Sequence, residues 1–247
     1  MFEPRVAAAS LSGESDADWA RAVAEYVGCA FLGGIALDRA TRDAARALVE
    51  RDRSEFLPTD PIPFVDEQLG ALESVPIRPG INVRSATTGP IRRVGAVCRD
   101  HDAVLELNAH CRQGEMCRAG AGEALLRDSD RLAEQVSTAH ATGATVSVKV
   151  RAEVGGVDLP SVAETVEQAG GDVLHVDAMD SERIVERIAD ATDLFVIANN
   201  GVRGRESVRE YLGYGADAVS VGRASDDPAV LRAVRGAVEA ERPEVAR

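Results

Sequence analysis

Short apolar segments recur along the chain, and each is followed by a longer stretch with helical periodicity. Several are rich in β-branched residues and do not alternate with polar residues, as is typical of parallel strands buried on both faces. The predicted strands are Val6–Ser10, Ala30–Leu37, Gly80–Arg84, Val104–Ala109, Val146–Val150, Val173–Val176, Leu194–Asn199 and Ala218–Gly222. The predicted helices are Asp16–Val27, Thr41–Arg53, Ile91–Arg99, Ala121–Ala141, Leu159–Ala169, Ser181–Ala191, Arg205–Tyr214 and Pro228–Glu241.

Eight strand–helix units in 247 residues predict an α/β protein with the (β/α)8 TIM-barrel fold, as a single domain over residues 1–247. A doubly wound open sheet is the alternative, but it gives no reason for eight evenly spaced units. The least regular part is 55–79, which contains five prolines. There we expect an irregular loop region with a short helix near Val65–Leu72.

Composition and charge narrow the class of protein. No apolar run approaches the ~20 residues of a membrane span, and four irregularly spaced cysteines do not form a disulfide framework. We therefore expect a cytoplasmic protein without membrane contact. The net charge of −13 disfavours general binding to nucleic-acid backbones or anionic membranes.

The basic residues are almost all arginines, since Lys149 is the only lysine among 28 basic side chains. An acidic excess with almost no lysine suggests a halophilic protein, because concentrated salt screens like charges within a few ångströms. The alternative is a GC-rich genome that favours arginine codons.

Two glycine-containing loops follow the seventh and eighth predicted strands, where barrels commonly bind phosphate. Asn199, Asn200 and Gly201 follow one strand, and Gly222 and Arg223 follow the other. Glycine lets backbone N–H groups approach phosphate oxygens, and the arginine can add a charge-assisted contact. Alternatively, the glycines only make tight turns.

Polar residues also end the fourth and fifth predicted strands. Lys149 and Arg151 share the strand face that points into a barrel, and the single retained lysine indicates a site that requires a compact ammonium. Asn108 suits the edge of a flat heterocycle, and Cys111 suits proton donation or nucleophilic attack. The alternative for Cys111 is a buried structural cysteine.

The remaining cysteines carry less information. His110 and Cys117 match no familiar zinc spacing, so we expect no metal site. Cys29 and Cys98 are expected to be packing residues in or beside helices.

Four segments together resemble the dihydrouridine synthase family of FMN-dependent barrels, over roughly Asn82 to Ala224. The segment 107–128 resembles the family's active-site loop, in which the catalytic cysteine lies three residues after an asparagine and precedes a glycine-rich turn. The other segments are Val148–Arg151, which resembles the family's Val-Lys-x-Arg strand, and Ile197–Val202 and Gly215–Ala224, which resemble its two FMN-phosphate segments.

The resemblance implies reduction of a uracil 5,6 double bond: reduced FMN N5 gives a hydride to C6, and Cys111 protonates C5. It implies that Lys149 contacts the flavin N1/O2 edge and the ribityl chain. It also implies that Asn82 bonds the isoalloxazine pyrimidine, and that Asn108 and Arg151 orient the substrate ring. NADPH or NADH would reduce the flavin. The implied phosphate ligands are Asn199, Asn200, Gly201, Gly222 and Arg223.

Several positions depart from the family pattern. Arg112 replaces a proline, Val6–Ser12 replaces a Pro-Met motif, and Asp177 replaces a histidine for which His175 is a possible substitute. The sequence ends at the eighth predicted helix, so we expect a short, divergent branch without the C-terminal helical domain that helps the family to bind tRNA.

The substrate therefore stays open between uridine in tRNA and a free pyrimidine, as in dihydroorotate or dihydropyrimidine dehydrogenases, which carry a similar Asn-x-x-Cys loop. A flavin-binding barrel without catalysis is a third possibility, and a phosphosugar isomerase or aldolase is a fourth.

Overall fold

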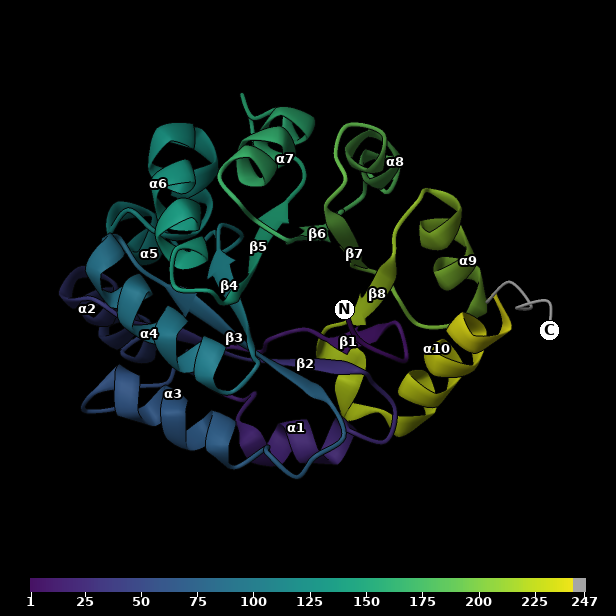
Figure 1. Ribbon diagram of the computed structural model, residues 1–247, viewed down its shortest axis with the longest axis horizontal. Helices are drawn as coiled ribbons and strands as arrows, with labels where there is room; N and C mark the ends of the chain where they lie inside the picture. Colours follow the sequence, from purple (N-terminus) through teal and green to yellow (C-terminus); the bar gives the residue numbers. More distant parts are fainter. Residues whose placement is uncertain (242–247) are drawn as a thin grey trace.

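The computed structural model describes residues 1–241, in which eight parallel strands close into a barrel in the order β1 to β8. Helices surround the strands (Figure 1), so the (β/α)8 prediction is confirmed. The strands are β1 Val6–Ala8, β2 Cys29–Ala36, β3 Arg78–Arg84, β4 Val104–Asn108, β5 Thr145–Arg151, β6 Val173–Asp177, β7 Phe195–Asn199 and β8 Ala218–Val221. The α-helices are α1 Ala17–Val23, α2 Arg39–Val49, α3 Pro61–Gly70, α4 Thr88–Asp100, α5 Gly114–Arg118, α6 Ser129–His140, α7 Leu159–Gln168, α8 Ile184–Ala189, α9 Arg205–Gly213 and α10 Pro228–Ala240.

Aspartate side chains begin many of these helices. Each accepts a hydrogen bond from a backbone N–H of the first turn, which has no partner inside the helix. The aspartates that do so are Asp16, Asp38, Asp60, Asp128, Asp158 and Asp227. Part of the acidic excess of the sequence therefore serves local structure.

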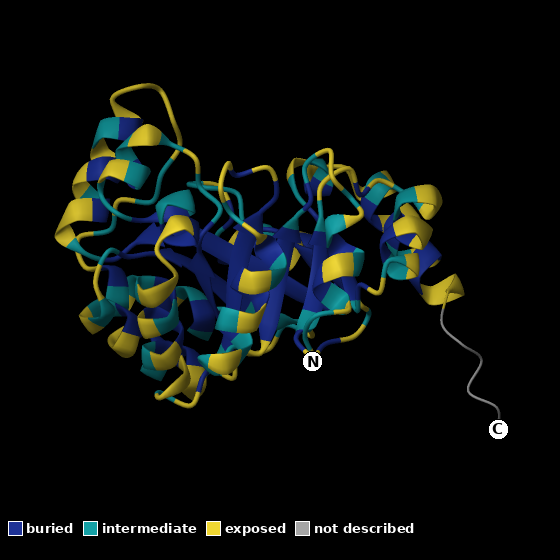
Figure 2. Cartoon of the chain, turned by 90° about the horizontal axis from the view of Figure 1, so that it is seen from above, coloured by how far each residue is buried: buried dark blue, intermediate teal, exposed yellow. Residues whose placement is uncertain are grey.

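The main hydrophobic core lies between the strands and the helices, and the strands are buried along most of their length (Figure 2). A second apolar cluster fills the amino-terminal half of the barrel interior, with Phe31, Val104, Val173 and Ile197 among its members. Toward the carboxyl ends of the strands, buried polar side chains fill the barrel interior instead. The barrel is therefore closed by apolar packing at one end and polar at the other.

The structure corrects four sequence-based predictions. Helix α3 begins at Pro61 and strand β3 at Arg78, so 55–79 is less irregular than expected, because proline is well tolerated in a first helical turn. The predicted helix Ala121–Ala141 is two elements, a 3₁₀ helix Gly122–Arg127 and α6, separated where Asp128 caps the second. Helix α5 was not predicted. Cys29 begins strand β2 instead of lying in or beside a helix.

Within residues 1–241, no helix is both long enough and apolar enough to cross a membrane.

Candidate functional site

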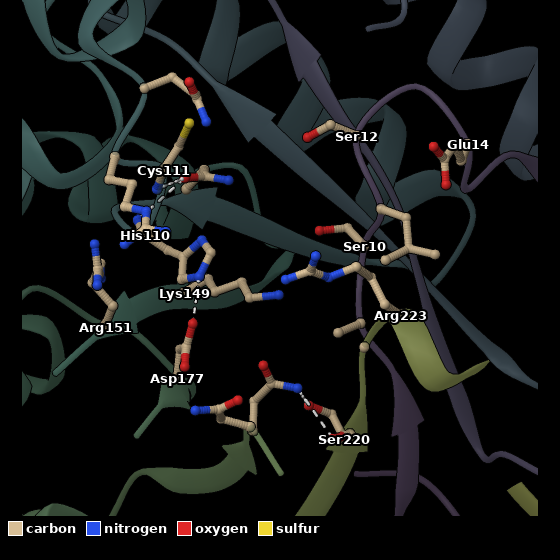
Figure 3. Close-up of a pocket in the computed structure, with 18 of the residues that line it drawn as sticks. Ser10, Ser12, Glu14, His110, Cys111, Lys149, Arg151, Asp177, Ser220 and Arg223 are labelled. Atoms are coloured by element: carbon tan, nitrogen blue, oxygen red, sulfur yellow. Dashed lines mark hydrogen bonds and ion pairs between the residues drawn. The ribbon is translucent and has the colours of Figure 1, made fainter. Parts of the chain in front are cut away.

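A cavity of ≈ 960 Å³ opens at the carboxyl ends of the strands. This is the end of the barrel at which we expected the chemistry from the sequence. The lining residues lie at or just beyond the carboxyl ends of every strand except β2, and Figure 3 shows several of them. Ten of the predicted site residues line it: Asn108, Cys111, Lys149, Arg151, Asp177, Asn199, Asn200, Gly201, Gly222 and Arg223. The ammonium and the thiol that the sequence singled out therefore share one cavity.

A fully buried carboxylate, Glu106 in β4, occupies the centre of the polar half of the barrel interior. Its Oε1 atom accepts a hydrogen bond from Asn82 Nδ2 at 2.7 Å. Its Oε2 atom accepts one from the Ser147 hydroxyl at 3.2 Å and lies 2.7 Å from His175 Nδ1. Three neighbouring side chains from three strands thus satisfy the carboxylate.

The protonation of this cluster follows from its surroundings. Burial alone raises the pKa of Glu106, but His175, Lys149 and the hydrogen bond from Asn82 outweigh it and hold the pKa below its ordinary value. Burial lowers the pKa of His175, so the ring is neutral at pH 7 and carries one proton. Because an ionised carboxylate can only accept, that proton lies on Nδ1.

This tautomer fixes the direction of the other hydrogen bonds. The Nε2 lone pair of His175 accepts from the Ser220 hydroxyl at 2.7 Å, and Ser220 Oγ accepts from Asn199 Nδ2 at 2.7 Å. On the other side, Asn82 Oδ1 accepts from Asn108 Nδ2 at 2.8 Å. Both chains of hydrogen bonds end at the Glu106 carboxylate. Glu106 therefore determines the orientation of the side-chain amides of Asn108 and Asn199.

Two predicted site residues, Asn82 and His175, lie beneath the cavity and not on its wall. Both are fully buried, and their polar atoms bond to protein partners. The roles of these residues toward a flavin or a substrate stay predictions.

Lys149 projects from β5 into the cavity (Figure 3), and the residue is only 4% exposed. Burial lowers the pKa of its amine, while the nearby carboxylates of Glu106 and Asp177 oppose the shift. Within residues 1–241 the amine makes no hydrogen bond or ion pair. An unpartnered cation in such a place is a contact point for an anionic or electron-rich ligand.

The loops after β7 and β8 leave open space for a ligand. Asn200 and Gly201 have positive φ angles of 91° and 66°, and Tyr211 fixes the turn by donating its hydroxyl to the Asn200 carbonyl at 2.9 Å. A Cβ atom built on Gly201 or Gly222 would meet no other atom within 4 Å. Since both glycines line the cavity, side chains there would occupy it.

Cys111 lies in a loop that several contacts hold in place. Its backbone N–H donates to Asn108 Oδ1 at 2.8 Å, and its carbonyl accepts from the Glu123 N–H at 2.9 Å. Gly122 approaches that carbonyl so closely that a Cβ atom would lie 2.2 Å from the oxygen. The glycine-rich turn of the sequence thus lets the chain fold back against the cysteine.

Two other elements support this loop. Met116 in α5 packs with Leu48 and two alanines of α2 in a small separate core. The Arg51 guanidinium also lies 2.5 Å from the Glu115 carboxylate.

His110 is a cavity residue whose role sequence reasoning missed. Its Nε2 atom lies 2.7 Å from Asp177 Oδ2, which joins the loop after β4 to the end of β6. Sequence reasoning considered His110 only as a metal ligand. No local signal pairs it with an aspartate 67 positions away, because the contact depends on barrel closure.

The cavity carries an excess of positive charge in a chain whose net charge is −13. Seven basic side chains line it against four carboxylates. Two of the carboxylates already have partners, since Glu55 pairs with Arg84 at 2.6 Å and Asp177 with His110. Among residues 1–241, no group of three His, Cys, Asp or Glu side chains is arranged to hold a metal ion.

The chain is similar in sequence and in fold to known proteins. An uncharacterized protein of Methanocaldococcus jannaschii is 26% identical over 235 residues, covering 90% of this chain and 89% of that protein. Two structures of FabK from Thermotoga maritima, one of them a point mutant, superpose with TM-scores of 0.61 and 0.59 at 15% and 16% identity. They match 91% and 90% of this chain, which spans only 63% and 58% of theirs, and show likeness of fold.

The sequence also matches the family model of dihydrouridine synthases over residues 96–246, which include the Cys111 loop, strand β5 and both glycine loops. Because this match takes in more than half of the chain, the protein belongs to the dihydrouridine synthase family.

Proposed function

We propose that the protein is an FMN-dependent oxidoreductase that reduces the 5,6 double bond of a uracil ring. The observation that carries this proposal is Lys149, a buried ammonium without a protein partner, in the same cavity as two open glycine loops and Cys111. Membership of the dihydrouridine synthase family supports the same reaction class.

The residues present fit an FMN molecule. The space beside Gly201 and Gly222 accommodates a phosphate, and Arg223 supplies a charge for it. Lys149 supplies a cation for the N1/O2 edge of the ring, which becomes anionic on reduction. The positive excess of the cavity suits a ligand with these two anionic parts. Bound FMN, reduced by NADPH or NADH, would supply the hydride.

The residues of β4 and β5 would act on the substrate. Arg151 donates one weak hydrogen bond to Glu123 through Nη1 at 3.4 Å, which leaves its Nη2 group as a donor for a ring carbonyl. Asn108 holds the backbone of the Cys111 loop, so that the thiol is presented to the cavity. Cys111 would then donate a proton to C5 of the ring.

The substrate that the family implies is uridine in tRNA. The second candidate is a free pyrimidine, and the net charge of −13 favours it, because a small ring needs no extended basic surface. Reduction assays with tRNA that lacks dihydrouridine and with uracil, together with an oxidation assay with dihydroorotate, distinguish the two.

The absorption spectrum of the purified protein, before and after addition of FMN, tests the proposal. We expect a yellow protein that NADPH or NADH bleaches without oxygen and that a uracil-type ring reoxidises. A Lys149→Met variant should bind FMN ten- to hundred-fold more weakly, since a buried hydrogen bond to a charged group contributes about 1.5–3 kcal/mol. A colourless protein that takes up no flavin would refute the proposal. Flavin binding without pyrimidine-dependent turnover would identify a barrel without this catalysis.

A further inference from the structure

His110 is held in one orientation by its neighbours. The backbone N–H groups of His110 and Cys111 both donate to Asn108 Oδ1, at 3.2 and 2.8 Å. The imidazole lines the cavity with 32% of the side chain exposed, while its partner Asp177 is 13% exposed (Figure 3). Asp177 is itself fixed, because its Oδ1 atom accepts the Met179 N–H at 3.2 Å.

The charges around the ring determine where its proton lies. Burial lowers the pKa of His110, and the cations Lys149 and Arg151 of β5 act in the same direction, against the hydrogen bond and charge of Asp177 in β6. For Asp177, burial would raise the pKa, but His110, the Met179 N–H and Lys149 outweigh it and lower it. The pair is therefore a neutral ring beside a carboxylate, and the single proton lies on Nε2, between them.

Nδ1 of His110 thus carries a lone pair, and no group among residues 1–241 donates to it. It is an uncharged acceptor in the cavity that also holds Arg151, the donor proposed for a ring carbonyl. A uracil ring presents the complementary edge: two carbonyl acceptors flank the N3–H donor. Cytosine has the same 5,6 double bond, but its N3 is an acceptor.

We propose that His110 is a specificity-determining residue whose Nδ1 atom accepts the N3–H of the substrate ring, so that the cavity selects a uracil-type ring over cytosine or an N3-alkylated ring. The inference rests on the proposed function for the identity of the ring. A site built around a ring N–H rejects analogues that lack it, because its acceptor is then left without a partner.

The test measures binding of uracil, 3-methyluracil and cytosine to the FMN-loaded protein, through the change in flavin absorbance. We expect uracil to bind at least about ten-fold more tightly than the other two rings. Uracil affinity should fall as the pH falls through the His110 pKa, which lies below its ordinary value, because protonated Nδ1 can no longer accept.

Two variants separate the two nitrogens of the ring. His110→Asn places an amide near Nδ1 and should retain most of the preference for uracil. His110→Gln places its amide near Nε2, keeps a partner for Asp177, and should lose both the preference and the pH dependence. His101, which lies near the opposite end of the barrel beside Asp66, provides the control His101→Gln, which should change neither.

Equal binding of uracil and 3-methyluracil to the unsubstituted protein would overturn the inference while leaving the proposed function in place. An unchanged preference in His110→Gln would do the same. A protein that binds FMN but none of these rings would overturn both the proposed substrate and this inference. Nitrogen NMR of the histidines without FMN gives an independent readout: we expect Nε2–H at pH 7, and an Nδ1–H tautomer or an imidazolium at His110 would overturn it.

Discussion

Replacement of Glu106 by glutamine tests whether a single buried carboxylate organises the polar half of the barrel. A glutamine has one accepting atom, whereas the carboxylate accepts from Asn82, Ser147 and His175 at once. The NH₂ group of the glutamine must therefore face at least one of these three donors. The substitution also removes the negative charge that most strongly opposes the lowering of the Lys149 pKa by burial.

The expected cost follows from these contacts. One lost hydrogen bond to a charged group costs about 1.5–3 kcal/mol, and a buried donor left without a partner costs about 1–3 kcal/mol more. We therefore expect Glu106→Gln to lower the free energy of unfolding by about 3–5 kcal/mol. For a domain of this size that corresponds to a loss of about 10 °C in Tm.

Urea unfolding at pH 7 measures this difference, with Glu164→Gln as the matched control on an exposed helix face. The pKa of Glu106 is lowered in the folded protein, so its contribution exists above the ordinary value of 4.5 and is lost as the pH falls through the folded-state pKa. The difference in the free energy of unfolding between Glu106→Gln and the Glu164→Gln control should therefore become smaller as the pH falls. A Glu106→Gln protein within about 0.5 kcal/mol of the control at pH 7 would refute the reasoning.

Three further predictions concern the loop, its glycine and the surface charge. Cys111→Ala should lower turnover by about 10²–10⁴-fold in single-turnover assays while FMN affinity stays unchanged, and full turnover would exclude the thiol as proton donor. Gly122→Ala should lower the free energy of unfolding by more than about 2 kcal/mol, because the φ of Gly122 is +63° and the new Cβ would meet the Cys111 carbonyl. The control is Gly236→Ala in α10, where a Cβ would meet nothing within 4 Å. This control should be neutral or stabilising. Tm should rise steadily from about 0.1 M to 1 M potassium chloride as the net charge of −13 is screened, and a Tm independent of salt would count against a halophilic protein.

The barrel could be predicted because its strands are continuous apolar runs, whose length and spacing are local properties of the chain. The site residues at strand ends followed from the same pattern, once the fold placed those ends at one rim. Asp128 was a readable signal for the break in the predicted helix Ala121–Ala141, because aspartate is a preferred residue immediately before a helix.

Other features depend on which strands become neighbours. Glu106 is a charge inside the run 104–107, and a charge in a strand buried on both faces indicates partners, but the sequence does not say which. The pairing of His110 with Asp177 joins the loop after β4 to the end of β6, two strands further along in the barrel. Such contacts form only when the barrel closes, so the spacing of apolar residues along the chain does not predict them.

The small core between α2 and α5 makes the exposure of the Cys111 thiol depend on whether α2 is folded. Helix α5 is too short to be stable alone, and Met116 is buried only while Leu48 and its neighbours in α2 stay in place. Amide hydrogen exchange should therefore show α2 and the Cys111 loop opening together as one cooperative unit, at a lower free energy than the strands beneath them. A change on the outer surface of α2 would then alter how often the cysteine becomes accessible to oxidants, at a distance from the cavity itself.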